Sequence, residues 1–268
     1  MDENNVAMDI WENQKMMMNI AYEPRAGFYE CDLYMRPKIV SRIVTKYVKK
    51  RNLKKWKKLS KGNKKQIKKY IDMIIRYESV GELSGAMASL VSDLLLAYPE
   101  MCKGYSPLLI TKVAQIHDII EGILHDIPDN GSKAHEEKVI IERRLMKEYT
   151  ERMPKGVGEC AYSLFLEMDA CSTREGIFLK MADKVQAILK LLYFENKGLY
   201  GNVYVRKMSK RDKEHAKIVG TGNCTDAWGY NTYLISREFP EDIVRVFEEI
   251  LCVAAMDVRG KFFDWWKL

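Results

Sequence analysis

The sequence predicts an all-α protein, and three observations support this fold class. From Pro37 to about Arg259, apolar residues recur every three to four positions, which is the period of an amphipathic helix. Strand-like alternation appears only around residues 202–206 and 228–236. Hydrophobic residues make up 47% and charged residues 30% of the 268 residues, a balance that allows a packed core. We therefore expect a helical fold with a small, partly irregular or β-hairpin C-terminal addition.

Helical segments follow one another along the chain. Apolar stripes occupy four early segments, within residues 39–47, 67–75, 87–95 and 109–116. A charged amphipathic helix is expected over 134–152, and another over 174–195 after the capping residues Ser172 and Thr173. A final helix should start after Pro240.

No internal repeat and no Pro- or Ser-rich linker divides the chain. We expect an N-terminal extension (1–36), a helical domain (37–200) and a C-terminal addition (201–268) with a turn at 220–222. No apolar run approaches the roughly 20 residues of a membrane helix. The acidic start and the six scattered cysteines argue against a secretory signal and a disulfide scaffold. These features predict a reduced, soluble, cytoplasmic protein.

Charge is concentrated in one segment. The formal net charge is +7, yet residues 36–69 contain sixteen Lys or Arg and no Asp or Glu, which leaves the rest of the chain at −9 (7 − 16). Such a block attracts phosphates through a salt-sensitive field. Three interpretations are open: a solvated Lys-rich helical face, nucleic-acid binding, or attraction of a phosphorylated substrate or a partner.

Two His-Asp dipeptides lie close together, in the run QIHDIIEGILHDIPDNG. Imidazole and carboxylate together suit Mn, Co, Fe, Ni or Zn, so His117 and Asp118 are candidate ligands, although a hydrogen-bonded core histidine is the alternative. Glu121 follows His117 by one helical turn and could position a metal-bound water or take its proton. Asp183 lies mid-helix among apolar residues, where a carboxylate needs a compensating charge such as a metal.

The order of several motifs resembles the HD-domain phosphohydrolases, most of all the 5'-deoxynucleotidase-like HD proteins. The motifs are ESVGELSGAMASLV, HDIIEGILHDIP and FLEMDACSTREGIFLKMADKVQAILKLLYFE, and the resemblance covers roughly residues 63–198. It implies the HD-type helical fold, with the basic segment at 36–69 and the core motifs at 76–198. It also implies a divalent metal (Mn, Co, Mg, Fe or Zn) and attack of a metal-activated water on a nucleotide or nucleoside monophosphate.

The resemblance also implies residue roles. His117, Asp118 and Asp183 match three of the four metal ligands, and Glu121 matches the glutamate thought to assist the attacking water. The remaining matches concern the substrate. Asp126 corresponds to an aspartate near sugar and phosphate, Arg76 to an arginine before the first-His motif, and Lys68 lies about where a phosphate-binding arginine would fall.

One position departs from the family pattern. Where the family has its first metal-binding His, this chain has Leu83, and no histidine precedes His117. Metal binding is therefore expected to be weak or absent, and the phosphohydrolase activity is expected to be impaired. Two other functions stay open: a catalytically inactive HD fold that binds a nucleotide or partner, and nucleic-acid binding through residues 36–69. The family resemblance further implies a homodimer, and we expect no membrane association.

Overall fold

The computed structural model describes residues 3–22, 80–120, 133–154, 156–196, 210–220 and 224–263. Residues 1–18 and 80–268 form one compact unit and residues 19–79 form another. The first unit contains nearly all of the described residues. Within them the regular structure is helical and no strand occurs, which confirms the predicted all-α class. The expected division at residues 36 and 200 stays a prediction.

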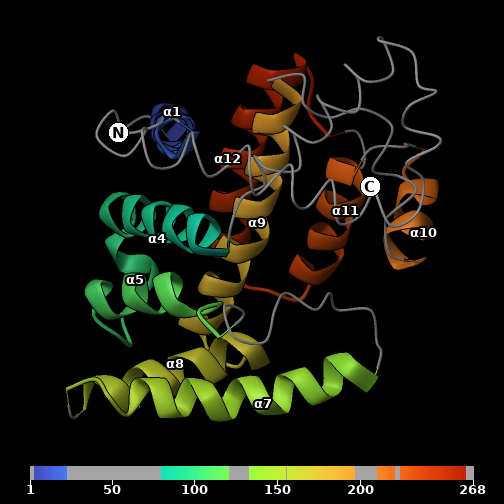
Figure 1. Ribbon diagram of the computed structural model, residues 1–268. Coiled ribbons are helices and arrows are strands. Elements are labelled where there is room, and N and C mark those ends of the chain that lie inside the picture. The colour runs from blue at the N-terminus through green and yellow to red at the C-terminus, as the bar shows by residue number, and fades with distance from the viewer. Residues whose placement is uncertain are drawn as a thin grey trace, which may run out of the picture. The chain divides into compact units, whose positions relative to one another are not determined.

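Helix α9 (Arg174–Asn196) is the central element of the first unit (Figure 1). Helices α4 (Val80–Ala97), α5 (Pro107–Ile116), α8 (Val157–Ala170), α11 (Cys224–Ser236) and α12 (Glu241–Arg259) all pack against it. A helix surrounded in this way must be apolar on most of its circumference. Its fully buried apolar side chains are Phe178, Leu179, Met181, Ala182, Val185, Ile188, Leu189 and Leu192. Asp183 therefore lies in the middle of a helix that is otherwise largely core.

The remaining helices pack around this centre. Helix α7 (Lys133–Thr150) packs on α8, α10 (Lys210–Ile218) packs on α11, and a short 3-10 helix (Pro99–Met101) follows α4. Helix α1 (Glu3–Tyr22) is tied to α12, because Trp11 Nε1 donates to Asp257 Oδ2 at 2.9 Å and Lys15 Nζ lies 3.0 Å from the same oxygen. Part of the expected N-terminal extension is thus a helix whose Trp11 is fully buried.

Local sequence signals explain several helix ends. Ser106 caps α5 by accepting from Leu109 N, with Pro107 in the first turn. The predicted capping residue Thr173 accepts from Gly176 N at 3.1 Å at the start of α9. Gly260 ends α12 in the left-handed conformation, at φ 65°. The helices predicted over 134–152, over 174–195 and after Pro240 are confirmed by α7, α9 and α12.

The strand expected around residues 228–236 is wrong, because this segment belongs to helix α11. The helix buries small residues, whereas the large side chains that produce the alternation are partly exposed; Trp228 is 40% and Leu234 37% exposed. The buried positions are Thr225, Ala227, Gly229, Thr232 and Ser236. Periodicity of large apolar residues therefore misses this helix. The second expected strand, 202–206, lies outside the described residues.

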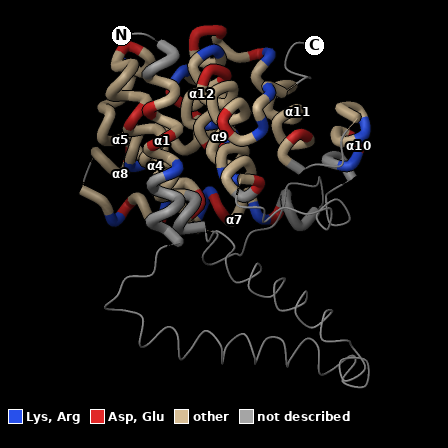
Figure 2. Tube along the Cα trace, turned by 90° about the horizontal axis from the view of Figure 1, so that it is seen from above, with Lys and Arg blue, Asp and Glu red and all other residues tan. Residues whose placement is uncertain are grey.

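Acidic and basic side chains are interspersed along the described helices (Figure 2). The basic segment 36–69 falls outside the described residues, so its structural role stays a prediction. None of the helices in the described ranges is long and apolar enough to cross a membrane.

Candidate metal centre

The first His-Asp dipeptide, His117-Asp118, directly follows helix α5, and His117 is the C-cap residue of that helix. The His117 side chain is buried, with 4% exposed, and its Nδ1 lies 2.8 Å from the carbonyl oxygen of Ala114. Because a carbonyl can only accept, Nδ1 carries the proton and donates to one of the last carbonyls of α5. This hydrogen bond fixes the orientation of the ring and leaves Nε2 to face the site.

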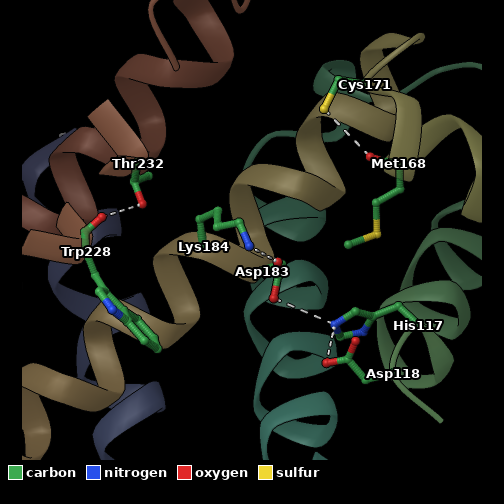
Figure 3. A network of polar contacts seen from close by, with 8 residues as sticks. All are labelled: His117, Asp118, Met168, Cys171, Asp183, Lys184, Trp228 and Thr232. Atoms are coloured by element: carbon green, nitrogen blue, oxygen red, sulfur yellow. Dashed lines mark hydrogen bonds and ion pairs between the residues drawn. The ribbon is translucent and has the colours of Figure 1, made fainter. Parts of the chain in front are cut away.

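The Nε2 atom of His117 faces two carboxylates (Figure 3). It lies 3.0 Å from Asp118 Oδ2 and 3.7 Å from Asp183 Oδ1. Nε2 is buried, and it makes no hydrogen bond of normal geometry with any described residue. With the proton on Nδ1, the lone pair of Nε2 points toward two anionic groups, which is unfavourable unless a cation lies between them. That cation is either a proton on Nε2 or a metal ion.

Without a metal, the two carboxylates act strongly on the charge state of the imidazole. Burial alone would lower the pKa of His117, but the contacts with Asp118 and Asp183 outweigh it and raise the pKa to about 10. Burial alone would raise the pKa of Asp183, because it disfavours the charged carboxylate. The charge of Lys184, followed by the contact with His117, instead holds it well below its usual range. The centre therefore favours a positive charge, either as a proton on His117 Nε2 or as a metal ion.

One ligand atom from each of His117, Asp118 and Asp183 lies within 4.8 Å of the others. We refer to these three residues as the metal centre. One imidazole nitrogen and two carboxylate oxygens suit the divalent metals Mn, Fe, Co, Ni and Zn, so the donor set fits the metal that the sequence implies. Asp183 comes from α9, and His117 and Asp118 come from the turn directly after α5, a helix that packs against α9.

The structure thus brings together the three predicted ligands and leaves the other predicted residues untested. Glu121, Asp126, Arg76 and Lys68 lie outside the described residues, as does His125 of the second His-Asp dipeptide. Leu83 belongs to α4, which packs against both α5 and α9, but its side chain is not among those described.

Sequence reasoning missed one participant, Lys184. Its Nζ lies 2.9 Å from Asp183 Oδ2 (Figure 3). Consecutive residues of a helix point about 100° apart and do not normally face each other, so adjacency alone gave no signal for this pair. The signal available in the sequence was Asp183 itself, because a carboxylate in a largely apolar helix needs a compensating cation.

The chain is similar in sequence to a known family and to several known proteins. A family model described as HD domain matches residues 57–220, which is more than half of the chain. The 5'-deoxynucleotidase HDDC2 of Dictyostelium discoideum is 28% identical over 110 residues, covering 41% of this chain and 58% of that protein. The 5'-deoxynucleotidase hdd1 of Schizosaccharomyces pombe is 33% identical over 90 residues, covering 32% of this chain and 46% of that protein.

The human 5'-deoxynucleotidase HDDC2 is 31% identical over 85 residues, covering 32% of this chain and 42% of that protein. The chain thus spans about half the length of the relatives it matches. No solved structure matches it.

Proposed function

Because the chain belongs to the HD domain family, we propose that it is a metal-dependent phosphohydrolase scaffold for nucleotide or nucleoside monophosphates. The observation that carries this proposal is the buried Nε2 of His117, which faces two carboxylates without a hydrogen bond among the described residues. The names of the relatives, 5'-deoxynucleotidases, support the substrate class.

The proposed roles begin with the metal centre. His117, Asp118 and Asp183 hold a divalent metal, and Ala114 O keeps the imidazole in the tautomer that leaves Nε2 available. When bound, such a metal supplies positive charge beside a phosphoryl group and makes water more acidic for attack on phosphorus. Asp183 approaches this position from α9, whose buried surroundings limit its movement.

The remaining roles follow the family pattern. Glu121 orients the attacking water and takes its proton, and Asp126 contacts the substrate or the leaving group. Arg76 and Lys68 bind the phosphate. Leu83 removes one of four ligands, so we propose that metal affinity and turnover of this chain are low. A homodimer stays a prediction.

Leu83 also favours a second function of another class, a catalytically inactive HD fold that binds a nucleotide or a partner. Turnover by the unaltered chain would exclude this alternative. Nucleic-acid binding through residues 36–69 is less favoured, because the positive charge of that segment does not distinguish a nucleic acid from a small phosphorylated substrate.

The test is phosphate release from a panel of nucleoside monophosphates with Mn²⁺ or Co²⁺, for the unaltered chain and for Leu83→His. We expect Leu83→His to raise turnover by about 100-fold or more, because a lost ligand costs at least as much as the roughly 10–100-fold seen for outer-sphere partners. The double variant Leu83→His/Asp118→Asn is the matched control and should return to background. Metal binding without turnover in Leu83→His would favour the binding function, and no metal binding in either protein would contradict the proposal.

A further inference from the structure

The contact between Lys184 and Asp183 is unusual for two consecutive helical residues. Their side chains leave the helix about 100° apart, yet Lys184 Nζ lies 2.9 Å from Asp183 Oδ2. The Lys184 side chain is 34% exposed, so most lysines in its position would extend their ammonium group into water. Holding a long side chain in one geometry costs conformational entropy, and a strong local attraction must offset this cost.

Asp183 supplies such an attraction, because its own pairing is incomplete. Its Oδ1 lies 3.7 Å from His117 Nε2, which is too long for a hydrogen bond, and Asp118 adds a second carboxylate nearby. Lys180, one turn earlier on α9, acts on Asp183 through its charge and makes no hydrogen bond with it. Among the described Lys and Arg side chains, Lys184 is therefore the one in direct contact with Asp183.

We propose that Lys184 is a tethered counter-ion that occupies Asp183 in the metal-free protein and thereby sets the metal affinity of the metal centre. The proposal rests on the proposed function, because it concerns the metal that this function requires. Asp183 presents Oδ1 to His117 and Oδ2 to Lys184, so the ammonium and an incoming divalent cation share one carboxylate.

This placement has two consequences of opposite sign. A divalent cation at the metal centre must either displace the ammonium group or lie close to a like charge, and both weaken metal binding. In the metal-free protein the same ammonium group offsets the negative charge of Asp183 and stabilises the fold. Lys184 is thus a positioning residue that acts on the metal through Asp183.

The experiment is a calorimetric titration of Mn²⁺ or Co²⁺ into the chelator-treated full chain. It compares the unaltered protein with Lys184→Met, Lys184→Arg and Lys180→Met, each also in the Leu83→His background, where affinity is high enough to measure. We expect Lys184→Met to bind the metal roughly tenfold more tightly and to melt about 2 °C lower without metal. Lys184→Arg should stay near the unaltered protein, because it keeps the charge. Lys180→Met removes the same charge one turn away and should change affinity by less than about threefold.

The outcomes separate this inference from the proposed function. Equal gains in Lys184→Met and Lys180→Met would show a general charge effect and overturn the inference. Unchanged or weaker metal binding in Lys184→Met would also overturn it, while leaving the phosphohydrolase proposal intact. Absence of metal binding in every protein, including those with Leu83→His, would contradict both.

Discussion

Helix α9 contributes to two charged clusters that differ in how their polar groups are paired. The metal centre includes Asp183, near the middle of the helix. The second cluster, which we call the arginine cluster, consists of Glu195 near the end of α9, Asp226 of α11 and Arg259 of α12. Both contain two carboxylates and one nitrogen base, and both connect separate helices.

In the arginine cluster the cation meets acceptors of good geometry. Arg259 Nε and Nη2 donate to the two oxygens of Glu195, both at 2.8 Å, and Nη1 donates to Asp226 Oδ1 at 2.6 Å. The guanidinium group also lies 4.9 Å from the centre of the Phe263 ring. A bidentate contact of this kind is directional and satisfies the buried groups on both sides.

The metal centre lacks this match. The Nε2 of His117 faces Asp118 and Asp183 without a hydrogen bond among the described residues, and Lys184 approaches from outside the trio. A matched buried cluster is costly to break, whereas a cluster that still needs a cation is suited to bind one. The comparison therefore supports a structural role for the arginine cluster and the proposed ligand-binding role of the metal centre.

The largest effect is expected from Asp183→Asn. The amide keeps the shape of the side chain but removes the anionic ligand, so metal affinity should fall by about a thousandfold, beyond the roughly 10–100-fold typical of outer-sphere changes. The free energy of unfolding of the metal-free protein should fall by about 1 kcal/mol, because the amide loses the attraction of Lys184 and His117 but also the repulsion from Asp118. Calorimetric titration of Co²⁺ and urea unfolding in chelator measure the two quantities.

These two measurements can contradict the proposed difference between the metal centre and the arginine cluster. If Asp183→Asn lowered the unfolding free energy by several kcal/mol, the metal centre would be a structural cluster like that of Arg259. The Leu83→His background again provides a metal affinity high enough for the titration.

The second prediction concerns Arg259→Met. It leaves the largely buried carboxylates of Glu195 and Asp226 without their main cation, so the free energy of unfolding should fall by about 3 kcal/mol. Metal affinity should remain unchanged. The matched control is Arg245→Met on the same helix. Its exposed guanidinium group lies 3.9 Å from the partly buried Glu249, and loss of this loose pair should cost less than about 0.5 kcal/mol. A tenfold change of metal affinity in Arg259→Met would show that the two clusters are coupled.

The sequence predicted one of these clusters and not the other, for a physical reason. His117 and Asp118 are adjacent, and Asp183 stands out as a charge in an apolar helix, so local patterns and the family resemblance pointed to the metal centre. Arg259 meets Glu195 and Asp226 only through tertiary packing, and arginine–carboxylate pairs leave no periodic trace. The contact of Lys184 with Asp183 was equally hidden, because helix geometry separates consecutive side chains.

The helices show the same limit. Strong apolar periodicity predicted α4, α5, α7, α9 and α12, whereas α11 was misjudged around Trp228 and Leu234 because its buried face consists of small residues. Helices that bury small residues place their large side chains outward, and the usual pattern is then lost.

The smallest predicted effect concerns Gln186, which lies on α9 between the two clusters. Its side chain is fully buried, and neither Nε2 nor Oε1 has a hydrogen-bond partner among the described residues. Replacing a buried amide that has no partner by an apolar group of similar shape is neutral or stabilising. Gln186→Met should therefore raise the free energy of unfolding by about 1 kcal/mol.

The control for Gln186→Met is Gln115→Met on α5, an exposed position paired with Lys112, which should change stability by less than about 0.5 kcal/mol. A loss of more than about 1 kcal/mol in Gln186→Met would mean that the amide is satisfied, for example by a buried water. A change in Co²⁺ affinity would instead extend the metal centre by one helical turn, since Gln186 follows Asp183 by three residues. If Gln186→Met left Co²⁺ affinity unchanged and increased the free energy of unfolding, Gln186 would have no part in metal binding. The metal centre would then consist of His117, Asp118 and Asp183 as defined.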